Sequence, residues 1–558
     1  MCAPHDTTRS NLLLHFWDGA GLASPDAPDC HGRRTVIRWH GQCSPSRAMA
    51  TSVDRNLASL LWFTASARGE NAAVIDSGDS TSYAALRDRA AAIALALLAA
   101  GLRTDDRVAI LLDNGVDAAA TFFGILAAGG IAVMLNHALR PRQMAQMLGN
   151  SGAKFLFTSA AFRADQLPPQ DTARPVLLVE EIPPAGDFVP LRRSGADLAQ
   201  IIYTSGSTGQ PKGVSVSHAN LWAAMRAVTS YLGITQTDRI AGILPFSFVY
   251  GMSQVLCAVG TGAALVVERS PLATRLVTEL RAQRITVLAA VPSLWLQLLG
   301  VPAFRTTPLP DLRIATNAGG RLPVAAVRAV RHAQPQAQLF LMYGLTEALR
   351  CTYLPPEEVD RRPDSIGRAI PGATILVLRD DLSPCAPGEV GELVYCGPTV
   401  ALGYWNDAAA TTRVFRPHPH LCDGAPDTER VVFTGDLARQ DDAGFLYHVG
   451  RRDRMIKTLG YRVSPDEVGD VIHASGEVAD CLVVGEADEL RGQRIVAHIV
   501  LAAGGSLKRL KRHCGIELPR FMQPARFEVR DELPRLPSGK HDVAAISATS
   551  ALSHGVRG

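Results

Sequence analysis

A segment rich in glycine and hydroxyl side chains, YTSGSTGQPKGV at residues 203–214, is the part of this sequence best suited to bind a chain of phosphates. Glycine lacks a Cβ, so successive backbone N–H groups can converge on one anion. The hydroxyl groups add further donors, and the lysine adds a mobile positive charge. The residues predicted to contact phosphate are Thr204, Ser205, Gly206, Ser207, Thr208, Gly209 and Lys212.

This segment differs from the helix-opening P-loop of the GxxxxGK[ST] type, because Gly213 follows Lys212 where that motif needs Ser or Thr for magnesium. Pro211 also lacks the N–H that a helix interior requires. The apolar residues on both sides, 200–203 and 214–216, predict a glycine-rich hairpin between two strands. A solvated Gly/Ser loop without a ligand has a similar composition and is the alternative.

Lysine is rare in this chain, since only six of the 56 basic residues are lysine. Lys212, Lys457 and Lys540 each lie in a glycine-containing motif. A compact ammonium performs tasks that a planar guanidinium cannot, so these three lysines are candidates for function. Drift in an arginine-rich background is the alternative.

Six short motifs follow one another along the chain: YTSGSTGQPKGV at 203, NAGGRLP at 317, YGLTEA at 343, TGD at 434, GRRDRMIKTLGYRVSP at 450 and PSGK at 537. Their order and spacing resemble the adenylate-forming superfamily of acyl-CoA synthetases, luciferases and peptide-synthetase adenylation domains, and most closely its AMP-forming acyl-CoA ligases. The resemblance implies an α/β fold. A large N-terminal body of parallel-sheet α/β subdomains with a small β subdomain would carry a mobile, small C-terminal α+β lid.

The resemblance also implies domain boundaries. We expect an N-terminal domain at 49–450, a hinge at 451–454 and a lid at 455–550. Residues 1–48 show neither a helical nor a strand period and no signal peptide. They are predicted to be a disordered extension or a wrongly assigned start, with Met49 as the physiological first residue.

Helix and strand patterns alternate in the first third of the chain. They predict a helix at 83–100 closed by Gly101, a strand at 107–112, a helix at 117–128 and a strand at 131–135. This βαβ order indicates a parallel sheet, and a second such region is expected over 201–345. Short strands and turns over 372–404 predict the small β subdomain.

Composition narrows the functional classes. With 47% apolar and 20% charged residues the chain can build a large core, and its net charge of +3 gives no general attraction to nucleic acid or anionic membranes. Ten cysteines without CxxC pairs suggest neither a zinc site nor a disulfide framework, so a reducing cytoplasm is expected. The longest uncharged run, 240–267, contains Pro245 and polar residues, which favours a buried strand–helix–strand segment over a membrane span.

One compact basic run, KRLKR at 508–512, is predicted to be a solvated helix face. Docking of coenzyme A phosphates or of an acidic carrier protein is the alternative.

Activation of a carboxylic acid by ATP sets demands on the site. Attack on the α-phosphate builds negative charge while pyrophosphate leaves, so the site needs cations, and magnesium needs at least one carboxylate ligand. The resemblance assigns Glu347 to magnesium, Thr346 to the α-phosphate, Tyr343 and the backbone of Gly319 and Gly320 to adenine, and Asp436 and Arg451 to the ribose. Taken alone, Thr346 and Glu347 would read as a helix cap and Asp436 as a turn residue.

The lid residues receive two sets of roles from the same resemblance. Lys540 would bridge the attacking carboxylate and the α-phosphate in the first half-reaction. The lid would then rotate about Asp453 and bring Lys457 and Gly460 to the site, where the glycine leaves room for a pantetheine arm. His541 and Asp542 depart from the hydrophobic-Asp-Arg ending common among relatives.

The segment LPFSFVYGM gives information on the class of the substrate acid. Amino-acid-activating relatives have an aspartate there for the α-ammonium, and the corresponding residue here is Val249, beside which an unpaired ammonium would be costly to bury. An ordinary α-amino acid is therefore disfavoured. Arg350 is expected to be a surface or structural arginine, with binding of a second carboxylate or hydroxyl as the alternative. The predicted apolar pocket for an aliphatic or aromatic acid consists of Val249, Tyr250, Met252, Val291 and Leu345.

Three functions follow from these observations. The first is an acyl-CoA ligase that uses a free carboxylic acid, ATP, magnesium and coenzyme A. The second is a freestanding adenylation enzyme that loads an acyl or amino acid onto the phosphopantetheine of a separate carrier protein. The third is a catalytically silent paralogue that binds a ligand, although intact Lys212, Glu347, Asp436 and Lys540 weigh against silence.

Overall fold

The computed structural model describes residues 56–139, 141–166, 174–184, 186–205, 211–270, 272–419, 430–458, 461–488, 492–537 and 539–546. The predictions for residues 1–48 and for Met49 therefore lie outside the described residues, as do those for Gly206, Ser207, Thr208, Gly209 and Gly460. Residues 52–558 form one compact unit, and the description below concerns this unit.

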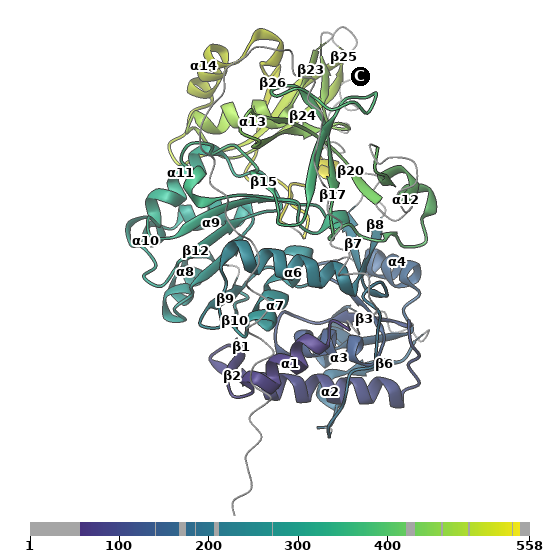
Figure 1. The fold of residues 1–558 in the computed structure, drawn as a ribbon. Helices are drawn as coiled ribbons and strands as arrows, with labels where there is room; N and C mark the ends of the chain where they lie inside the picture. Colours follow the sequence, from purple (N-terminus) through teal and green to yellow (C-terminus); the bar gives the residue numbers. More distant parts are fainter. Residues whose placement is uncertain are drawn as a thin grey trace, which may run out of the picture. The chain divides into compact units, whose positions relative to one another are not determined.

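One sheet of the N-terminal body carries the phosphate hairpin (Figure 1). Its strand order is β18-β8-β7-β4-β3-β5-β6, and the strands from β7 to β6 run parallel. The strands are β3 (Arg107–Leu111), β4 (Ile131–Met134), β5 (Phe155–Thr158), β6 (Val176–Leu178), β7 (Leu198–Ser205), β8 (Pro211–Ser217) and β18 (Gly403–Tyr404).

A second sheet has the strand order β15-β14-β13-β12-β11-β9-β10-β1-β2, and it runs parallel from β13 to β1. Its strands are β1 (Ala72–Asp76), β2 (Asp79–Ser82), β9 (Arg239–Gly242), β10 (Ala264–Val267), β11 (Val287–Ala290), β12 (Ile314–Asn317), β13 (Gln338–Tyr343), β14 (Thr352–Leu354) and β15 (Arg368–Ala369). The predicted parallel α/β architecture is thus confirmed in both regions.

Helices pack against these two sheets. They are α1 (Ser59–Arg68), α2 (Tyr83–Ala99), α3 (Val116–Ala127), α4 (Pro141–Ser151), α5 (Ala160–Gln166), α6 (His218–Leu232), α7 (Val249–Thr261), α8 (Ala273–Ala282), α9 (Pro292–Gly300), α10 (Pro302–Thr306), α11 (Val324–Ala333) and α12 (Ala408–Val414). The predicted helices at 83–100 and 117–128 are confirmed as α2 and α3, and Gly101 follows α2 with a φ of +91°. The uncharged run at 240–267 is the predicted strand–helix–strand segment, β9-α7-β10.

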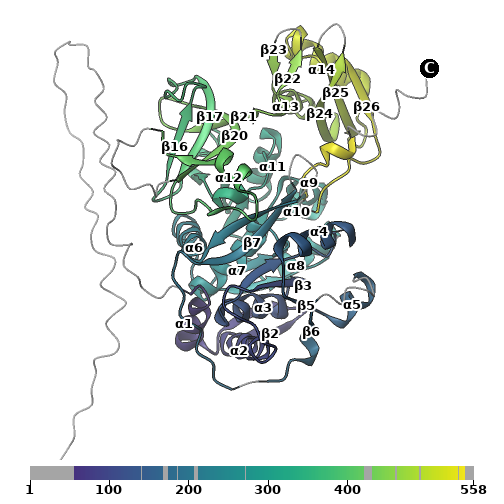
Figure 2. The ribbon, with the colours of Figure 1, turned by 90° about the vertical axis from the view of Figure 1, so that its right-hand side faces the viewer.

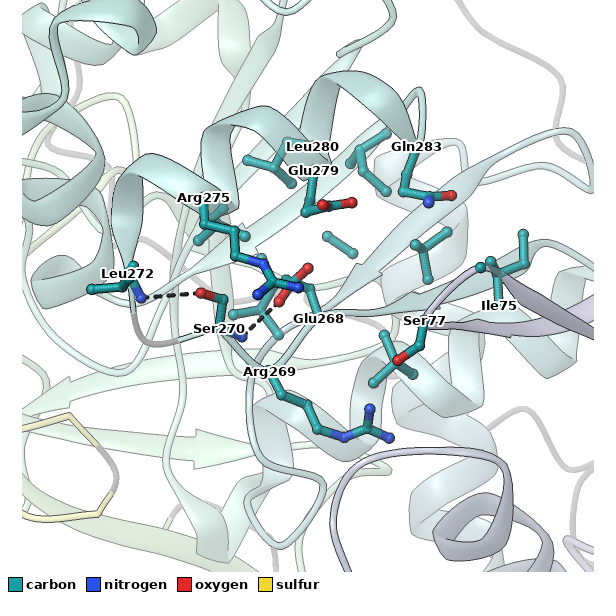
Figure 3. A pocket seen from close by; sticks show the side chains of 17 residues that line it. Ile75, Ser77, Glu268, Arg269, Ser270, Leu272, Arg275, Glu279, Leu280 and Gln283 are labelled. Carbon is teal, nitrogen blue, oxygen red and sulfur yellow. Dashed lines mark hydrogen bonds between the residues drawn. The ribbon is translucent and has the colours of Figure 1, made fainter.

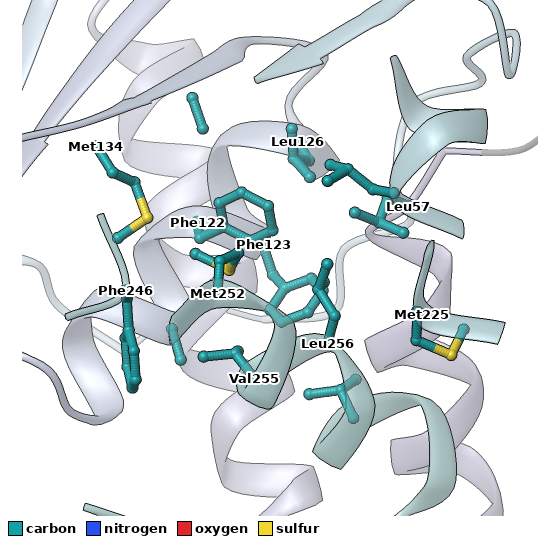
Figure 4. Close-up of a cluster of buried hydrophobic side chains, with 14 of the residues drawn as sticks. Leu57, Phe122, Phe123, Leu126, Met134, Met225, Phe246, Met252, Val255 and Leu256 are labelled. Carbon is teal, nitrogen blue, oxygen red and sulfur yellow. The ribbon is translucent and has the colours of Figure 1, made fainter. Parts of the chain in front are cut away.

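Helices α3, α6 and α7 share one hydrophobic core (Figure 4). Phe122 and Phe123 of α3 are fully buried, with their ring centroids 5.4 Å apart, and they lie among Met225 of α6 and Met252 and Leu256 of α7. Burying each such side chain contributes about 1.5–3 kcal/mol. This core holds α7, and with it Val249 at the start of α7, in a fixed position.

Two smaller sheets follow in the sequence. The first has the order β16-β17-β20-β19, with β21 paired to β20. It is a small β subdomain as predicted, but it reaches from 374 to 451 instead of 372–404, and residues 403–404 belong to β18 of the sheet with the phosphate hairpin. Its strands are β16 (Thr374–Leu378), β17 (Val390–Cys396), β19 (Phe415–Pro417), β20 (Arg430–Gln440) and β21 (Leu446–Arg451).

The second sheet belongs to the predicted lid. Its order is β23-β22-β25-β24, with β26 paired to β25, and Figure 2 shows it grouped with α13 and α14. The elements are β22 (Ile456–Thr458), β23 (Tyr461–Val463), α13 (Pro465–Ala474), β24 (Val478–Asp488), β25 (Gly492–Leu501), α14 (Leu507–Glu517) and β26 (Arg526–Val529). These elements enclose a hydrophobic core of their own, which includes Val468, Ile499 and Leu510.

The basic run at 508–512 lies in α14. Leu510 faces the core while Lys508, Arg509, Lys511 and Arg512 are exposed, so the predicted solvated face is confirmed. No helix in the described ranges combines the length and the hydropathy that a membrane crossing requires.

The buried carboxylate of Asp238 ties together the starts of three neighbouring strands. Asp238 precedes β9, Thr286 precedes β11 and Arg313 precedes β12. The Thr286 hydroxyl and the Arg313 Nε each donate to Asp238 Oδ1 at 2.7 Å, and the Thr235 N–H donates to Oδ2 at 2.7 Å. Burial would raise the pKa of Asp238, but these donors hold it below its ordinary value.

We expect Asp238→Asn to lower the free energy of unfolding by about 1–3 kcal/mol at neutral pH, because a buried charged acceptor is lost. A carboxyl with a depressed pKa stabilises the fold above the pKa of the unfolded group, about 3.9, and this contribution is lost as the pH falls through the folded pKa. The gap between wild type and variant in urea unfolding should therefore close in acid. Asp360→Asn is the control, since Asp360 is 69% exposed in its pair with Arg331 and should change stability by less than about 1 kcal/mol. Equal losses in both variants would contradict the role of Asp238.

Candidate active site

The phosphate segment forms the predicted hairpin. Strands β7 and β8 pair antiparallel, with Thr204 opposite Lys212 and the backbone of Ser205 opposite that of Pro211. The Thr204 hydroxyl donates to the Lys212 carbonyl at 3.5 Å. A Cβ on Gly213 would lie 2.8 Å from Ile201 Cγ2, so the strand packing requires glycine there.

Tyr404 contacts both Lys212 and Glu347. Tyr404 of β18 lies opposite Val214 of β8, and Lys212 Nζ is 5.3 Å from the centroid of the Tyr404 ring. The Tyr404 hydroxyl donates to Glu347 Oε1 at 2.6 Å. Burial and the Glu347 carboxylate raise the pKa of Tyr404, so its hydroxyl stays protonated and remains a donor.

Helix α6 positions the chain on both sides of this contact. The Asn220 Nδ2 donates to the carbonyls of Pro398 and Val400 at 2.9 Å each, and the Ala401 N–H donates to the Glu347 carbonyl at 2.9 Å. Asn220 also closes the capping box of α6 with Ser217. The segment that leads into β18 is therefore tied both to the start of α6 and to Glu347.

Thr346 and Glu347 directly follow β13. Thr346 begins a short 3-10 helix, Thr346–Ala348, three residues after Tyr343 ends the strand. Both side chains are half-buried. Glu347 thus presents a carboxylate at the end of β13, in reach of the Tyr404 hydroxyl.

Asp436 is a buried carboxylate with one open oxygen. The Tyr343 hydroxyl donates to its Oδ2 at 2.5 Å. Its Oδ1 is buried and has no hydrogen-bond partner among the described residues, although Arg451 Nη1 lies 3.4 Å and His448 Nε2 3.7 Å away. Burial would raise the pKa of Asp436, but His448, Arg451 and Tyr343 hold it below its ordinary value. An ionised carboxylate with an open acceptor fits the hydroxyl donors of a ribose.

Val291, directly after β11, is contacted from two directions. A Cβ on Gly319, which has a φ of +82°, would lie 3.2 Å from Val291 Cγ1, and a Cβ on Gly320 would lie 3.2 Å from the Pro292 ring. A Cβ on Gly539 would lie 3.3 Å from Val291 Cγ2 and 3.0 Å from Ser293 Oγ. The loop that carries Lys540 therefore packs closely on the body next to the glycine pair.

Lys540 lies among the charged residues of the site. Desolvation by its surroundings lowers the pKa of Lys540, and Arg454 and Arg451 add to this effect while the carboxylates of Asp436 and Glu347 oppose it. The residue is nevertheless exposed, so solvent screens these interactions in part. Its ammonium is thus within electrostatic reach of both the predicted ribose carboxylate and the predicted magnesium ligand.

Lys457 lies on a different part of the lid. It pairs with Arg462 in the β22–β23 hairpin, and its N–H donates to Gln493 Oε1 at 2.7 Å. Its side chain is exposed and makes no ion pair with any described residue. The structure therefore brings Lys540, and not Lys457, to the body.

The predicted hinge residue Asp453 lies in the turn between β21 and β22. Its Oδ1 pairs with Arg451 Nε at 3.2 Å, while Arg452 pairs with Asp380 at 2.6 Å. A further ion pair joins the body to the lid, from Arg321 Nη1 to Asp470 Oδ2 at 2.6 Å.

A small cavity of about 20 Å³ lies at the start of α7. Of the predicted pocket residues, Val249 and Met252 line it, whereas Tyr250, Val291 and Leu345 are not part of its lining. Tyr250 lies nearby and hydrogen-bonds through its hydroxyl to Thr316 Oγ1 at 2.6 Å. Arg350 also lines the cavity and is only 4% exposed, which excludes the interpretation as a surface arginine.

The comparisons with known proteins agree with this geometry. The profile of the AMP-binding enzyme family matches residues 61–405, and that of the AMP-binding enzyme C-terminal domain matches residues 467–540. The chain belongs to the AMP-binding enzyme family of adenylate-forming ligases.

Two relatives are named after different acyl acceptors, a carrier protein and CoA. The L-proline–[L-prolyl-carrier protein] ligase of Pseudomonas fluorescens is 32% identical over 496 residues, which cover 85% of this chain and 95% of the relative. The indoleacetate–CoA ligase of Aromatoleum aromaticum is 31% identical over 484 residues, which cover 82% and 91%. A linear gramicidin synthase protein of Brevibacillus parabrevis is 32% identical over 475 residues, but the chain spans only 6% of that protein.

A solved structure extends the likeness to the whole fold. The o-succinylbenzoate coenzyme A synthetase of Bacillus subtilis, in complex with ATP and a magnesium ion, is 28% identical to this ligase with a TM-score of 0.77. The match covers 86% of this chain and 98% of the synthetase.

A larger cavity of about 570 Å³ lies elsewhere in the ligase, between β1, β10 and α8 (Figure 3). Glu268, Arg275 and Glu279 are among its lining residues. It contains none of the residues predicted for ATP or for the acid, so the proposed chemistry does not depend on it.

Two residues of the ligase site are absent from the sequence predictions, Tyr404 and His448. Tyr404 stands in the stretch ALGYW, where nothing local distinguishes it from a core aromatic residue. His448 lies in β21, outside all six sequence motifs. The pairing of β21 with β20 brings it close to Asp436. A search for aromatic or histidine residues near the TGD motif could have found His448, but not Tyr404.

We expect Tyr404→Phe to raise the magnesium concentration that the ligase requires. Loss of a hydrogen bond to a charged carboxylate costs about 1.5–3 kcal/mol, or about 10- to 100-fold in the magnesium concentration needed for half-maximal ATP turnover. The phenyl ring retains the contact with Lys212. Tyr447→Phe is the control, because it removes a similar bond to Asp441, 3.1 Å long, outside the site. An unchanged magnesium requirement in Tyr404→Phe would refute the link between Tyr404 and the metal ligand.

Proposed function

We propose that this ligase activates a free carboxylic acid with ATP, releasing pyrophosphate, and then transfers the acyl group to the thiol of coenzyme A, releasing AMP. The observation that carries the proposal is the packing of the lid loop at Gly539 against Val291 and Ser293 of the body, which brings Lys540 within electrostatic reach of Asp436 and Glu347. This arrangement favours a catalytic role over silent ligand binding.

The first half-reaction needs positive charge around the phosphates. In our proposal Lys212 and the hairpin hold the β- and γ-phosphates, and Thr346 contacts the α-phosphate. Tyr343, Gly319 and Gly320 face adenine, while Asp436 and Arg451 bind the ribose. Glu347, oriented by Tyr404, would hold magnesium, which when bound neutralises charge on the phosphate oxygens.

Lys540 would supply the remaining charge. As the carboxylate of the acid attacks, the Lys540 ammonium would lie between the attacking oxygen and the α-phosphate. It would stabilise the negative charge that develops there. This task requires the protonated form of the lysine. It also leaves no room for a thiol at the same position.

The second half-reaction would use another face of the lid. We propose domains at 49–450 and 455–550 joined by a hinge at 451–454, with rotation about Asp453. Lys457 and Gly460 would then replace Lys540 at the site and admit the pantetheine arm.

A carrier protein is the second candidate for the thiol. The carrier-protein ligase of Pseudomonas fluorescens and the coenzyme A ligase of Aromatoleum aromaticum are about equally similar to this chain, at 32% and 31% identity. The exposed basic face of α14 suits either coenzyme A phosphates or an acidic carrier surface.

The test is ATP–pyrophosphate exchange with a panel of fatty, aryl, dicarboxylic and amino acids, followed by mass spectrometry with coenzyme A. Exchange with formation of an acyl-CoA supports the ligase, and exchange without it favours the carrier protein. Lys540→Ala should slow exchange by about 100- to 1,000-fold, because a preorganised charge is lost, while thioester formation from a synthetic acyl-adenylate persists.

A lowered pKa of Lys540 predicts a specific pH dependence of exchange. The ammonium loses its proton at a pH below that of an ordinary lysine, so wild-type exchange should fall as the pH rises through this lowered pKa. Lys540→Arg keeps its charge in this range and should lack the alkaline decline. The same decline in both proteins would rule out Lys540 as its cause.

The hinge makes a separate prediction. Asp453→Pro should retain ATP–pyrophosphate exchange, because Lys540 already lies at the site, but should lose thioester formation by about 100-fold or more, because proline fixes φ at the turn. Asp453→Ala removes the same ion pair with Arg451 and leaves φ free, so it should retain both half-reactions. Equal loss of the two half-reactions in Asp453→Pro would refute the two-state lid.

A further inference from the structure

Arg350 is a buried guanidinium without a charged partner. Only 4% of the residue is exposed, and its Nε has no hydrogen-bond partner in the described part of the chain. Its side chain forms no ion pair with any described carboxylate. A buried charge is costly unless it is paired, and arginine cannot escape the cost by losing its proton.

The neighbours of Arg350 supply no negative charge at neutral pH. Its Cζ lies 5.0 Å from the centroid of the Tyr250 ring. The titratable groups that face it are Tyr231, Tyr250, Cys257 and Cys351, from α6, α7 and the chain between β13 and β14. Burial raises the pKa of each of them, to about 12 for Tyr250 and Cys257, so all are neutral.

A strained backbone conformation precedes Arg350. Leu349 has a φ of +54°, a conformation that a bulky L-residue rarely adopts. A Cβ on Gly344 would lie 2.8 Å from the Leu349 carbonyl and 3.1 Å from Arg350 Cα, so glycine is needed for this close approach. Strain of this kind persists where the surrounding structure fixes it, as at ligand sites.

Arg350 faces the small cavity at the start of α7. Val249, Met252 and Ser253 of α7 line the same cavity. The start of α7 has no side-chain cap, so its partial positive charge lies on the same side as the guanidinium. A volume of about 20 Å³ admits a group little larger than one water molecule, which fits the end of a substrate better than a long alkyl chain.

We propose that the acid activated by this ligase carries a second carboxylate, and that Arg350 binds it. The inference rests on the proposed function and names its substrate class. The distal carboxylate would pair with the buried guanidinium and supply the negative charge that its described neighbours do not. A cationic substrate would be repelled at the same place.

The experiment compares glutarate, adipate and terephthalate with their monomethyl esters in ATP–pyrophosphate exchange. The esters keep the carbon skeleton between the two acid groups, add one methyl group and remove one charge. Wild type should prefer the free diacids by about 100-fold in kcat/KM, as expected for a buried charge-assisted bond. Arg350→Met should lose about this factor on the diacids and gain on the esters, while Arg350→Lys should retain part of the preference.

Arg368→Met is the matched control, because Arg368 also stacks on an aromatic ring, Phe445 at 4.0 Å, but is exposed. It should leave the preference unchanged. Binding of ATP by each variant, followed through its unfolding midpoint, shows that the fold persists.

Two further outcomes have distinct meanings. Exchange by wild type with esters or simple monoacids in preference to diacids would overturn the role of Arg350 and leave the proposed function intact. Absence of exchange with every acid, in a protein that still binds ATP, would overturn both. An equal loss on diacids and esters in Arg350→Met would show a purely structural arginine.

Discussion

The buried carboxylate of Asp436 is the interaction on which the arrangement of the site depends. It accepts from Tyr343 at the end of β13, pairs with Arg451 at the end of β21 and lies near Lys540 of the lid. One ionised group therefore connects the large sheet of the body, the small β subdomain and the lid. Because the carboxylate is buried, its direct partners Tyr343 and Arg451 must stay in place to compensate its desolvation.

The charges of the site are divided between rigid and movable parts. Glu347 is fixed by the Tyr404 hydroxyl and by the hydrogen bond from Ala401 to its carbonyl. Asn220 ties the same segment to α6. Lys540, by contrast, is held through the packing of one loop against Val291 and Ser293. This contrast suits an enzyme in which the body stays constant while the lid exchanges one lysine for another.

Much of this structure could be predicted from the sequence. The parallel α/β sheets follow from alternating helix and strand patterns, and the hairpin at 203–214 follows from glycines between two apolar runs. The assignment of Glu347, Asp436 and Lys540 to one site comes only from the resemblance to a family, because no local pattern relates residues so far apart. Tyr404 could not be predicted, since only the pairing of β18 with β8 brings it to the site, whereas His448 is close enough to the TGD motif in sequence to be found by a local search. For Arg350 the sequence left a surface, a structural and a binding role open, and its burial next to Leu349, whose positive φ leucine itself does not signal, excludes only the surface role.

The position of Val291 has an evolutionary consequence. This one side chain lies next to Gly319 of the body and Gly539 of the lid loop, and an added Cβ on these glycines would come within 3.2 and 3.3 Å of it. A change of its size would alter both the shape of the site and the fit of the closed lid. Mutations that adapt this region to a new acid would therefore also change how readily the lid closes, so substrate range and the timing of the two half-reactions cannot evolve independently at this residue.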